Sequence, residues 1–140
     1  MPSNYSDIEK ALVAAAISVD GITPTGYPNV ELTDSEKGGG LWIQLHNMRS
    51  ESVPATLGDA GEDDHRGFLQ IDINYPQHKG SGPALSKADE FSSFFVAGKA
   101  LMYNSQEVRV LSSSLSSGRY VGGYYRLSLT VNYYARTARA

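Results

Sequence analysis

The side chains best suited to chemistry in this sequence lie in one short stretch, Asp63-Asp64-His65. Carboxylates clustered beside an imidazole can bind a divalent cation, which a small hydrolase or nuclease could use. The spacing fits no EF-hand loop, however, and His46 and His78 add no H-x-H or H-E-x-x-H pattern. We therefore interpret all three histidines as ordinary surface or loop residues, and a metal-dependent enzyme remains an alternative.

A second stretch that could bind a ligand is Gly80-Ser81-Gly82, just before a predicted helix. Free backbone amides at a helix N-terminus can hold an anion. The stretch has neither the lysine of a phosphate-binding loop nor the full G-x-G-x-x-G pattern, so a plain turn is favoured. The chain also lacks a G-x-S-x-G nucleophile motif. The sequence thus predicts no enzyme, no catalytic residue, no metal and no cofactor.

Composition bounds the class of protein. The 140 residues are 41% hydrophobic and 19% charged, which predicts one folded domain over 1–140 rather than a disordered chain. The formal net charge of −3 argues against a basic protein that coats nucleic acid. Cysteine is absent, which excludes disulfides and thiolate metal sites. No stretch reaches the roughly 20 apolar residues that span a bilayer, so no membrane partner is predicted.

The two helices that we expect carry apolar residues at helical spacing. The first covers about 6–19, with a capping box formed by Ser6 and Glu9 and a stop at Asp20-Gly21. The second begins at Pro83 and ends near Gly98. Their predicted buried faces are Ile8, Leu12, Ala15 and Val19 in the first, and Leu85, Ala88, Phe91, Phe94 and Phe95 in the second.

Period-two alternation indicates the strands. It is clear over 41–45, 69–75 and 125–133, weaker over 107–111, and a short strand follows Pro28 at about 30–32. Each strong strand has one polar face, which favours a mostly antiparallel or mixed sheet whose apolar face both helices cover. The predicted fold class is therefore α+β in a single domain.

Three segments show no useful periodicity. Residues 49–65 are expected to form a long loop with an acidic cluster, and Ser112–Gly118 a solvated hairpin loop. Residues 135–140 are expected to form a C-terminal tail. The residues of the long loop that we single out as candidates for contact are Asp59, Glu62, Asp63 and Asp64, together with Arg66 just after it.

Tyrosines concentrate near the C-terminus. Tyr125 and Tyr133 fall on the apolar side of the last strand and are expected in the core. Tyr124 and Tyr134 face outward, where an intersubunit interface and simple strand propensity explain them equally well. We take Tyr120, Tyr124, Arg126 and Tyr134 as the candidate interface residues.

Several of these signals also occur in a characteristic order. They are Tyr27-Pro28-Asn29-Val30, residues 40–45, the loop 55–61, residues 66–73, the stretch from Gly80 to Pro83, and residues 122–131. In this order they resemble the tail terminator, or tail completion, proteins of long-tailed bacteriophages. The resemblance covers about residues 27–134. The segments 66–73 and 123–131 are its most specific parts, while the Ser112–Gly118 loop departs from it.

The resemblance implies a structural virion protein of the tail neck, present in the host cytoplasm during assembly. Such proteins form a homo-oligomer, a hexameric ring, that caps the tail tube, ends its growth and offers a surface to the head-side connector protein. The expected partners are therefore the tail tube protein and that connector, while genomic DNA passes through the lumen without specific binding. An acidic segment 59–64 would suit a lumen that repels phosphate, or equally a contact between rings. Another neck component, such as a head-closure or head–tail joining protein, stays open.

Overall fold

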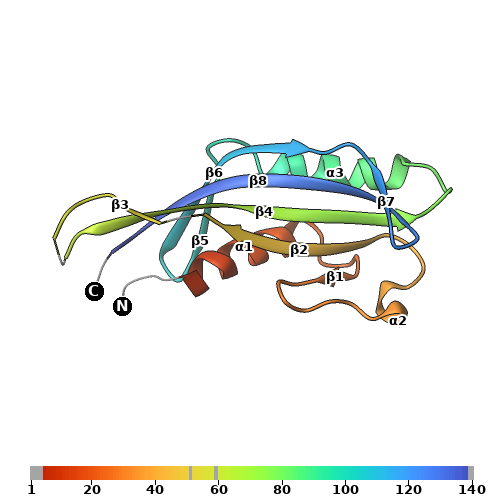
Figure 1. Cartoon of the computed structure of the whole chain (residues 1–140), viewed down its shortest axis with the longest axis horizontal. Coiled ribbons are helices and arrows are strands. Elements are labelled where there is room, and N and C mark those ends of the chain that lie inside the picture. The colour runs from red at the N-terminus through yellow and green to blue at the C-terminus, as the bar shows by residue number, and fades with distance from the viewer. Residues whose placement is uncertain (1–4, 51, 59, 139–140) are drawn as a thin grey trace.

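Two strands of fifteen residues, β4 and β8, lie side by side along the length of the molecule (Figure 1). The computed structural model describes residues 5–50, 52–58 and 60–138. The elements in chain order are α1 (Tyr5–Val19), β1 (Thr25–Gly26), α2 (Asp34–Lys37), β2 (Trp42–Arg49), β3 (Val53–Pro54), β4 (Glu62–Pro76), α3 (Gly82–Phe94), β5 (Ala100–Tyr103), β6 (Gln106–Leu115), β7 (Arg119–Val121) and β8 (Tyr124–Ala138).

One sheet contains the strands of the described residues, in the order β1-β2-β4-β8-β6-β5, with β3 added to β4 and β7 added to β8. Among these strands only the β1–β2 pair is parallel, so the sheet is mixed. With the helices of the described residues it makes one mostly-strand domain, which confirms the α+β class in this coarser form. None of the helices among those residues is long and apolar enough to cross a membrane.

The core forms on one face of the sheet because alternate residues of the central strands point the same way. The register places Leu45 opposite Ile71, and Ile71 opposite Leu129. All three are at most 1% exposed, which confirms the predicted register of the three strongest strands. Buried residues of both α1 and α3 join the same core, among them Leu12 and Phe91.

The first helix occurs where the sequence predicts it, but its start differs. It begins at Tyr5, so Ser6 lies inside the first turn and the predicted capping box at that position is wrong. Its end is fixed by Asp20, whose side chain accepts hydrogen bonds from the amides of Ile22 and Thr23 at 2.9 and 3.0 Å. Asp20 also forms a 2.5 Å ion pair with Lys87, which ties the end of α1 to α3.

The second predicted helix, α3, is shorter than expected and rotated on the core. It ends at Phe94, four residues before Gly98, so Gly98 is not its cap. Leu85 is 42% exposed, whereas Ala84 is fully buried in its place. Ala88, Phe91 and Phe95 are buried as predicted. The small Ala84 allows close approach of helix and sheet, a choice that apolar spacing alone does not reveal.

The short strand at the start of the chain is also misplaced. Val30 forms only an isolated bridge with Tyr27, and the strand is β1, which precedes Pro28 and pairs with β2. The helix α2 was not predicted, although Thr33 and Glu36 form its capping box. Four residues are too few for an amphipathic pattern, so only the cap could have indicated this helix.

Three segments predicted to be irregular contain strand. The expected loop 49–65 contains β3 and the first residues of β4, and the expected hairpin loop 112–118 contains the end of β6. The expected tail 135–140 is strand through Ala138, and 139–140 lie outside the described residues. The reason is backbone pairing: 62–66 pairs with 134–138, and 112–115 pairs with 129–132. A polar segment needs no hydrophobic alternation to enter a sheet that already supplies its hydrogen-bonding partners.

Candidate interaction surfaces

The candidate residues gather at two opposite ends of the β4–β8 pair. The ladder runs through fifteen residue pairs, from Glu62 opposite Ala138 to Pro76 opposite Tyr124. At about 3.4 Å per residue the two ends lie roughly 48 Å apart. Glu62, Asp63 and Asp64 lie at one end of this pair, and Tyr124 and Arg126 lie at the other. This separation cannot be read from the chain, because only folding brings residues 62–76 and 124–138 into one ladder.

The acidic end is a strand arm, which we define as β3 with residues 62–66 of β4 and 134–138 of β8. Asp64 is bound by Arg136, with Nε 2.8 Å from Oδ1 and Nη2 3.4 Å from Oδ2. This hydrogen bonding lowers the pKa of Asp64 and raises that of Arg136. The arm therefore presents paired charges rather than a purely acidic loop. Asp59 lies outside the described residues.

Strand geometry divides the cluster Asp63-Asp64-His65 between two faces. Neighbouring side chains on a strand point to opposite sides, so Asp64 is separated from Asp63 and His65. The His65 ring is held by two hydroxyls, with Nδ1 2.6 Å from Ser52 Oγ and Nε2 2.7 Å from Thr137 Oγ1. The described part of the chain contains no group of three or more His, Cys, Asp or Glu side chains placed to hold a metal ion.

Arg66 and Tyr134 lie together at the base of the arm, opposite each other in the β4–β8 register. Arg66 is exposed and Tyr134 is half-buried. Tyr134 also stands opposite Arg109 of β6. The structure therefore brings these two candidates together and separates Tyr134 from the other interface tyrosines.

The opposite end of the sheet is aromatic. The rings of Trp42 and Tyr124 meet edge to face, with centroids 5.3 Å apart and an interplanar angle of 82°. The ammonium of Lys37 lies 4.4 Å from the centroid of the Trp42 ring, a favourable cation–π distance. Tyr120 is 64% exposed and its centroid is 5.8 Å from that of Tyr125, which is half-buried rather than fully in the core.

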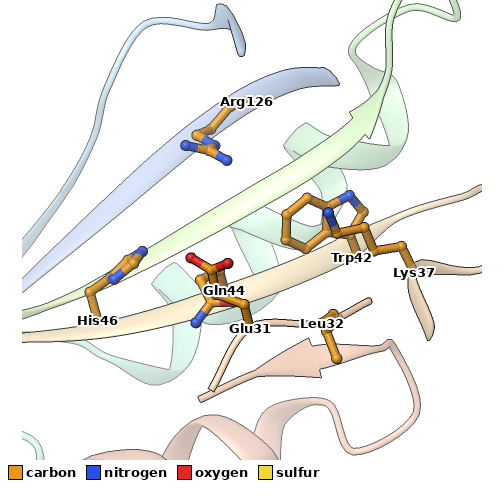
Figure 2. A pocket seen from close by; sticks show the side chains of 7 residues that line it. All are labelled: Glu31, Leu32, Lys37, Trp42, Gln44, His46 and Arg126. Carbon is orange, nitrogen blue, oxygen red and sulfur yellow. The ribbon is translucent and has the colours of Figure 1, made fainter. Parts of the chain in front are cut away.

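A cavity of about 250 Å³ opens beside the Trp42 ring on the polar face of the sheet (Figure 2). Arg126 reaches it from β8, and its Nε donates a 2.6 Å hydrogen bond to Oδ1 of the buried Asn74. The cavity is smaller than most sites for organic ligands, and its lining carries both signs of charge. It is lined by Glu31, Leu32, Lys37, Trp42, Gln44, His46 and Arg126.

A buried carboxylate beneath this surface was missed by the sequence analysis. Asp72 is 2% exposed and accepts hydrogen bonds from Ser128 Oγ at 2.6 Å and Gln70 Nε2 at 2.8 Å. His46 Nε2 lies 3.2 Å from its second oxygen, and Ser128 in turn accepts from Arg119 at 2.9 Å. The polar stripe of alternate residues was visible in the sequence, but its burial was not.

These features define a class: an elongated, strand-rich protein with candidate docking surfaces at the two ends of one sheet. A family model described as phage tail terminator protein matches residues 7–133, and the chain belongs to this family. No curated protein matches the chain.

Solved structures also match the chain, among them the following two. The first, whose title names no function, has a TM-score of 0.70 at 18% identity, covering 93% of this chain and 91% of its own. The second, titled as the virion of a native gene transfer agent particle, has a TM-score of 0.48 at 16% identity and covers 95% and 92%. Membership of the phage tail terminator family identifies the chain as a structural protein of the phage tail.

Proposed function

We propose that this chain forms a ring of six copies that caps the phage tail tube, ends its growth and provides the surface to which the head attaches. The tail terminator family supports the general role. The ring, its six copies and its two partners, the tail tube protein and the head-side connector protein, follow from what the family name and the resemblance imply.

One structural observation carries the proposal. Termination requires a ring with two unlike faces, one that matches the tube and one that does not accept another tube ring. The two ends of the β4–β8 pair are unlike in chemistry: ion-paired Asp64 and Arg136 at one, Trp42, Tyr124 and Lys37 at the other. A ring whose axis follows these strands presents one end on each side.

The arm then contacts a neighbouring ring or lines the lumen through which DNA passes. Two variants distinguish these roles. Exchanging Asp64→Arg with Arg136→Asp keeps the net charge and the local ion pair but reverses its direction, so a specific ring contact is lost while a repulsive lumen is preserved. Asp64→Lys alone adds positive charge, which would hold phosphate in a lumen. Tail length and head attachment report the first effect, and DNA delivery by joined particles reports the second.

The test of the function itself is electron microscopy of tails made in cells infected with phage that lack the gene. We expect tails of abnormal length that fail to join heads, and normal tails when the gene is supplied in trans. Tails of normal length that still fail to join heads would instead identify another neck component. Tails that are normal in length and join heads would refute both roles.

A further inference from the structure

Both edges of the sheet contain a stretch of strand without a neighbour. In β2, pairing with β1 covers only Ile43 and Gln44, so 45–49 has no strand on the side away from β4 within the described residues. In β6, pairing with β5 ends at Arg109, followed by bonds of Val110 to the chain at Gly98 and Lys99. Residues 111–115 have no described strand on the side away from β8.

The outward backbone groups of both stretches can be assigned. The amide of Ile43 donates to Pro24 O at 2.9 Å, away from β4. Backbone N–H and C=O groups of successive residues point to alternate sides of a strand, so those of Leu45, Asn47 and Arg49 also point away from β4. The amide of Ser116 donates to Ser128 O at 2.9 Å, toward β8. By the same alternation, the groups of 113 and 115 point away from β8 into the open edge.

The two open stretches lie at the same level of the sheet. The row that starts at Leu45 passes through β4 and β8 and ends at Leu115. The next row in the same phase starts at Asn47 and ends at Ser113. In both rows, the residue of β2 and the residue of β6 direct their backbone N–H and C=O groups away from the sheet.

The strand directions also match. From β2 through β4 and β8 to β6 every pair is antiparallel, so β6 runs opposite to β2. A second copy, rotated about an axis along the strands, therefore places its β2 antiparallel to β6 of the first. Its outward amides and carbonyls then face those of residues 113 and 115 in phase, as in an ordinary antiparallel ladder. The carbonyl of Leu45 accepts a 3.4 Å hydrogen bond from Gln44 Nε2, which the pairing would replace.

We propose that neighbouring copies of this chain join by pairing residues 111–115 of β6 with residues 45–49 of the next copy's β2. The inference rests on the proposed ring and names the surface that builds it. The contact is heterologous, because the two surfaces that meet are different. Such contacts form a closed ring when the rotation that relates neighbouring copies closes on itself.

The side chains of the β6 stretch fit this occupant. Exposed sheet edges are normally protected by Pro or charged residues, yet 111–115 reads Leu-Ser-Ser-Ser-Leu, with neither. Leu111 and Leu115 are 42% and 41% exposed, and Met48 is 49% exposed on the opposite edge. Met48 is level with Ser112, next to Leu111, so pairing would cover these apolar groups across the contact.

Disulfide cross-linking tests the pairing directly, because the chain has no cysteine. Within one copy, Met48 and Ser112 are three strand spacings apart, about 14 Å at ~4.8 Å each. A disulfide requires Cα atoms within roughly 7 Å, so Met48→Cys with Ser112→Cys cannot close inside a copy. Across the proposed contact they form a close pair.

Oxidised tails from infected cells carrying this double variant should show a ladder of covalent multimers up to the whole ring. The matched control, Met48→Cys with the exposed Ser117→Cys, should show none.

A backbone variant provides the second readout. Ser113→Pro removes an outward amide and leaves the in-chain ladder intact, whereas Ser113→Ala keeps the amide. We expect Ser113→Pro to fold with an unchanged melting temperature and to be lost from tails, and Ser113→Ala to be incorporated normally. A ring of six that yields no ladder and tolerates Ser113→Pro would overturn the pairing while the ring stands. A chain absent from wild-type tails would instead refute the proposed function.

Discussion

The ion pair between Asp20 and Lys87 offers the sharpest test of what holds the helices together. Asp20 is 7% exposed and Lys87 is 15% exposed at the side chain, so neither charge is well solvated. Asp20→Ala removes the partner of Lys87 and also the acceptor for the amides of Ile22 and Thr23. It therefore disrupts both the α1–α3 connection and the turn that ends α1.

The expected cost follows from these contacts. Removing one member of a buried pair costs about 3–5 kcal/mol. Lys87 keeps a second partner, Glu90, at 2.8 Å, so Asp20→Ala should fall at the lower end, about 3 kcal/mol. Asp20→Asn retains an acceptor for the two amides and loses only the charge, which should cost about 1.5–2 kcal/mol.

The pH dependence of the free energy of unfolding gives an independent test of the Asp20–Lys87 pair. Burial alone raises the pKa of Asp20, but hydrogen bonds from Lys87, Thr23 and Ile22 outweigh it and hold this pKa far below its ordinary value. A lowered folded-state pKa contributes stability that is present above the unfolded pKa, about 3.9, and is lost as pH falls toward the folded pKa. Wild-type stability should therefore decline below about pH 4 more steeply than that of Asp20→Asn.

Urea unfolding of the purified chain measures both effects. With a slope of about 2 kcal/mol per M, Asp20→Ala should lower the midpoint by roughly 1.5 M at pH 7. A double-mutant cycle with Lys87→Met isolates the pair, and its two changes should be less costly together than their sum. A loss below about 0.5 kcal/mol for Asp20→Ala, or strict additivity in the cycle, would refute the reasoning.

Three further predictions concern the sheet. Leu129→Ala removes a side chain that is 1% exposed and should cost about 2–5 kcal/mol in urea unfolding; a loss under about 1 would contradict the assigned core. Gly67→Ala places a methyl group against the carbonyl of Met48 and 2.9 Å from the Tyr133 hydroxyl, so about 1–3 kcal/mol should be lost, and a neutral result would contradict this close approach. His65→Ala breaks the hydrogen bonds to two hydroxyls and should lower the free energy of unfolding by about 1–2 kcal/mol, without affecting tail completion at a permissive temperature. If the variant folds but tails are not completed, His65 has a direct role in assembly.

The local signals of the sequence were reliable where a pattern depends on one face of one element. Leu127, Leu129 and Val131 alternate with polar residues, and all three are buried. The same holds for residues 69–73, where Leu69, Ile71 and Ile73 are fully buried. A period of two or 3.6 can be read without knowing the neighbours, so these core positions could be predicted.

The candidate surfaces could not be predicted to the same extent. Asp64 was expected in a solvated acidic loop, but Arg136, 72 residues away, pairs with it across two strands. Asp72 lies on the polar face of its strand, yet it is buried there because Ser128 and Gln70 cover it with hydrogen bonds. Each of these environments depends on the register between strands that are distant in the chain.

The class of fold, the main core residues and the resemblance to tail terminators can be read from the chain, because they depend on local periodicity and residue order. That the polar segments 62–66 and 135–138 are strands, and that parts of β2 and β6 lack a neighbouring strand among the described residues, became known only from the folded sheet. Backbone hydrogen bonds between strands carry little side-chain signature, so no pattern of residue types announces them. Whether an amide finds a partner depends on which strand lies beside it, and that is settled by the order of strands in the folded sheet.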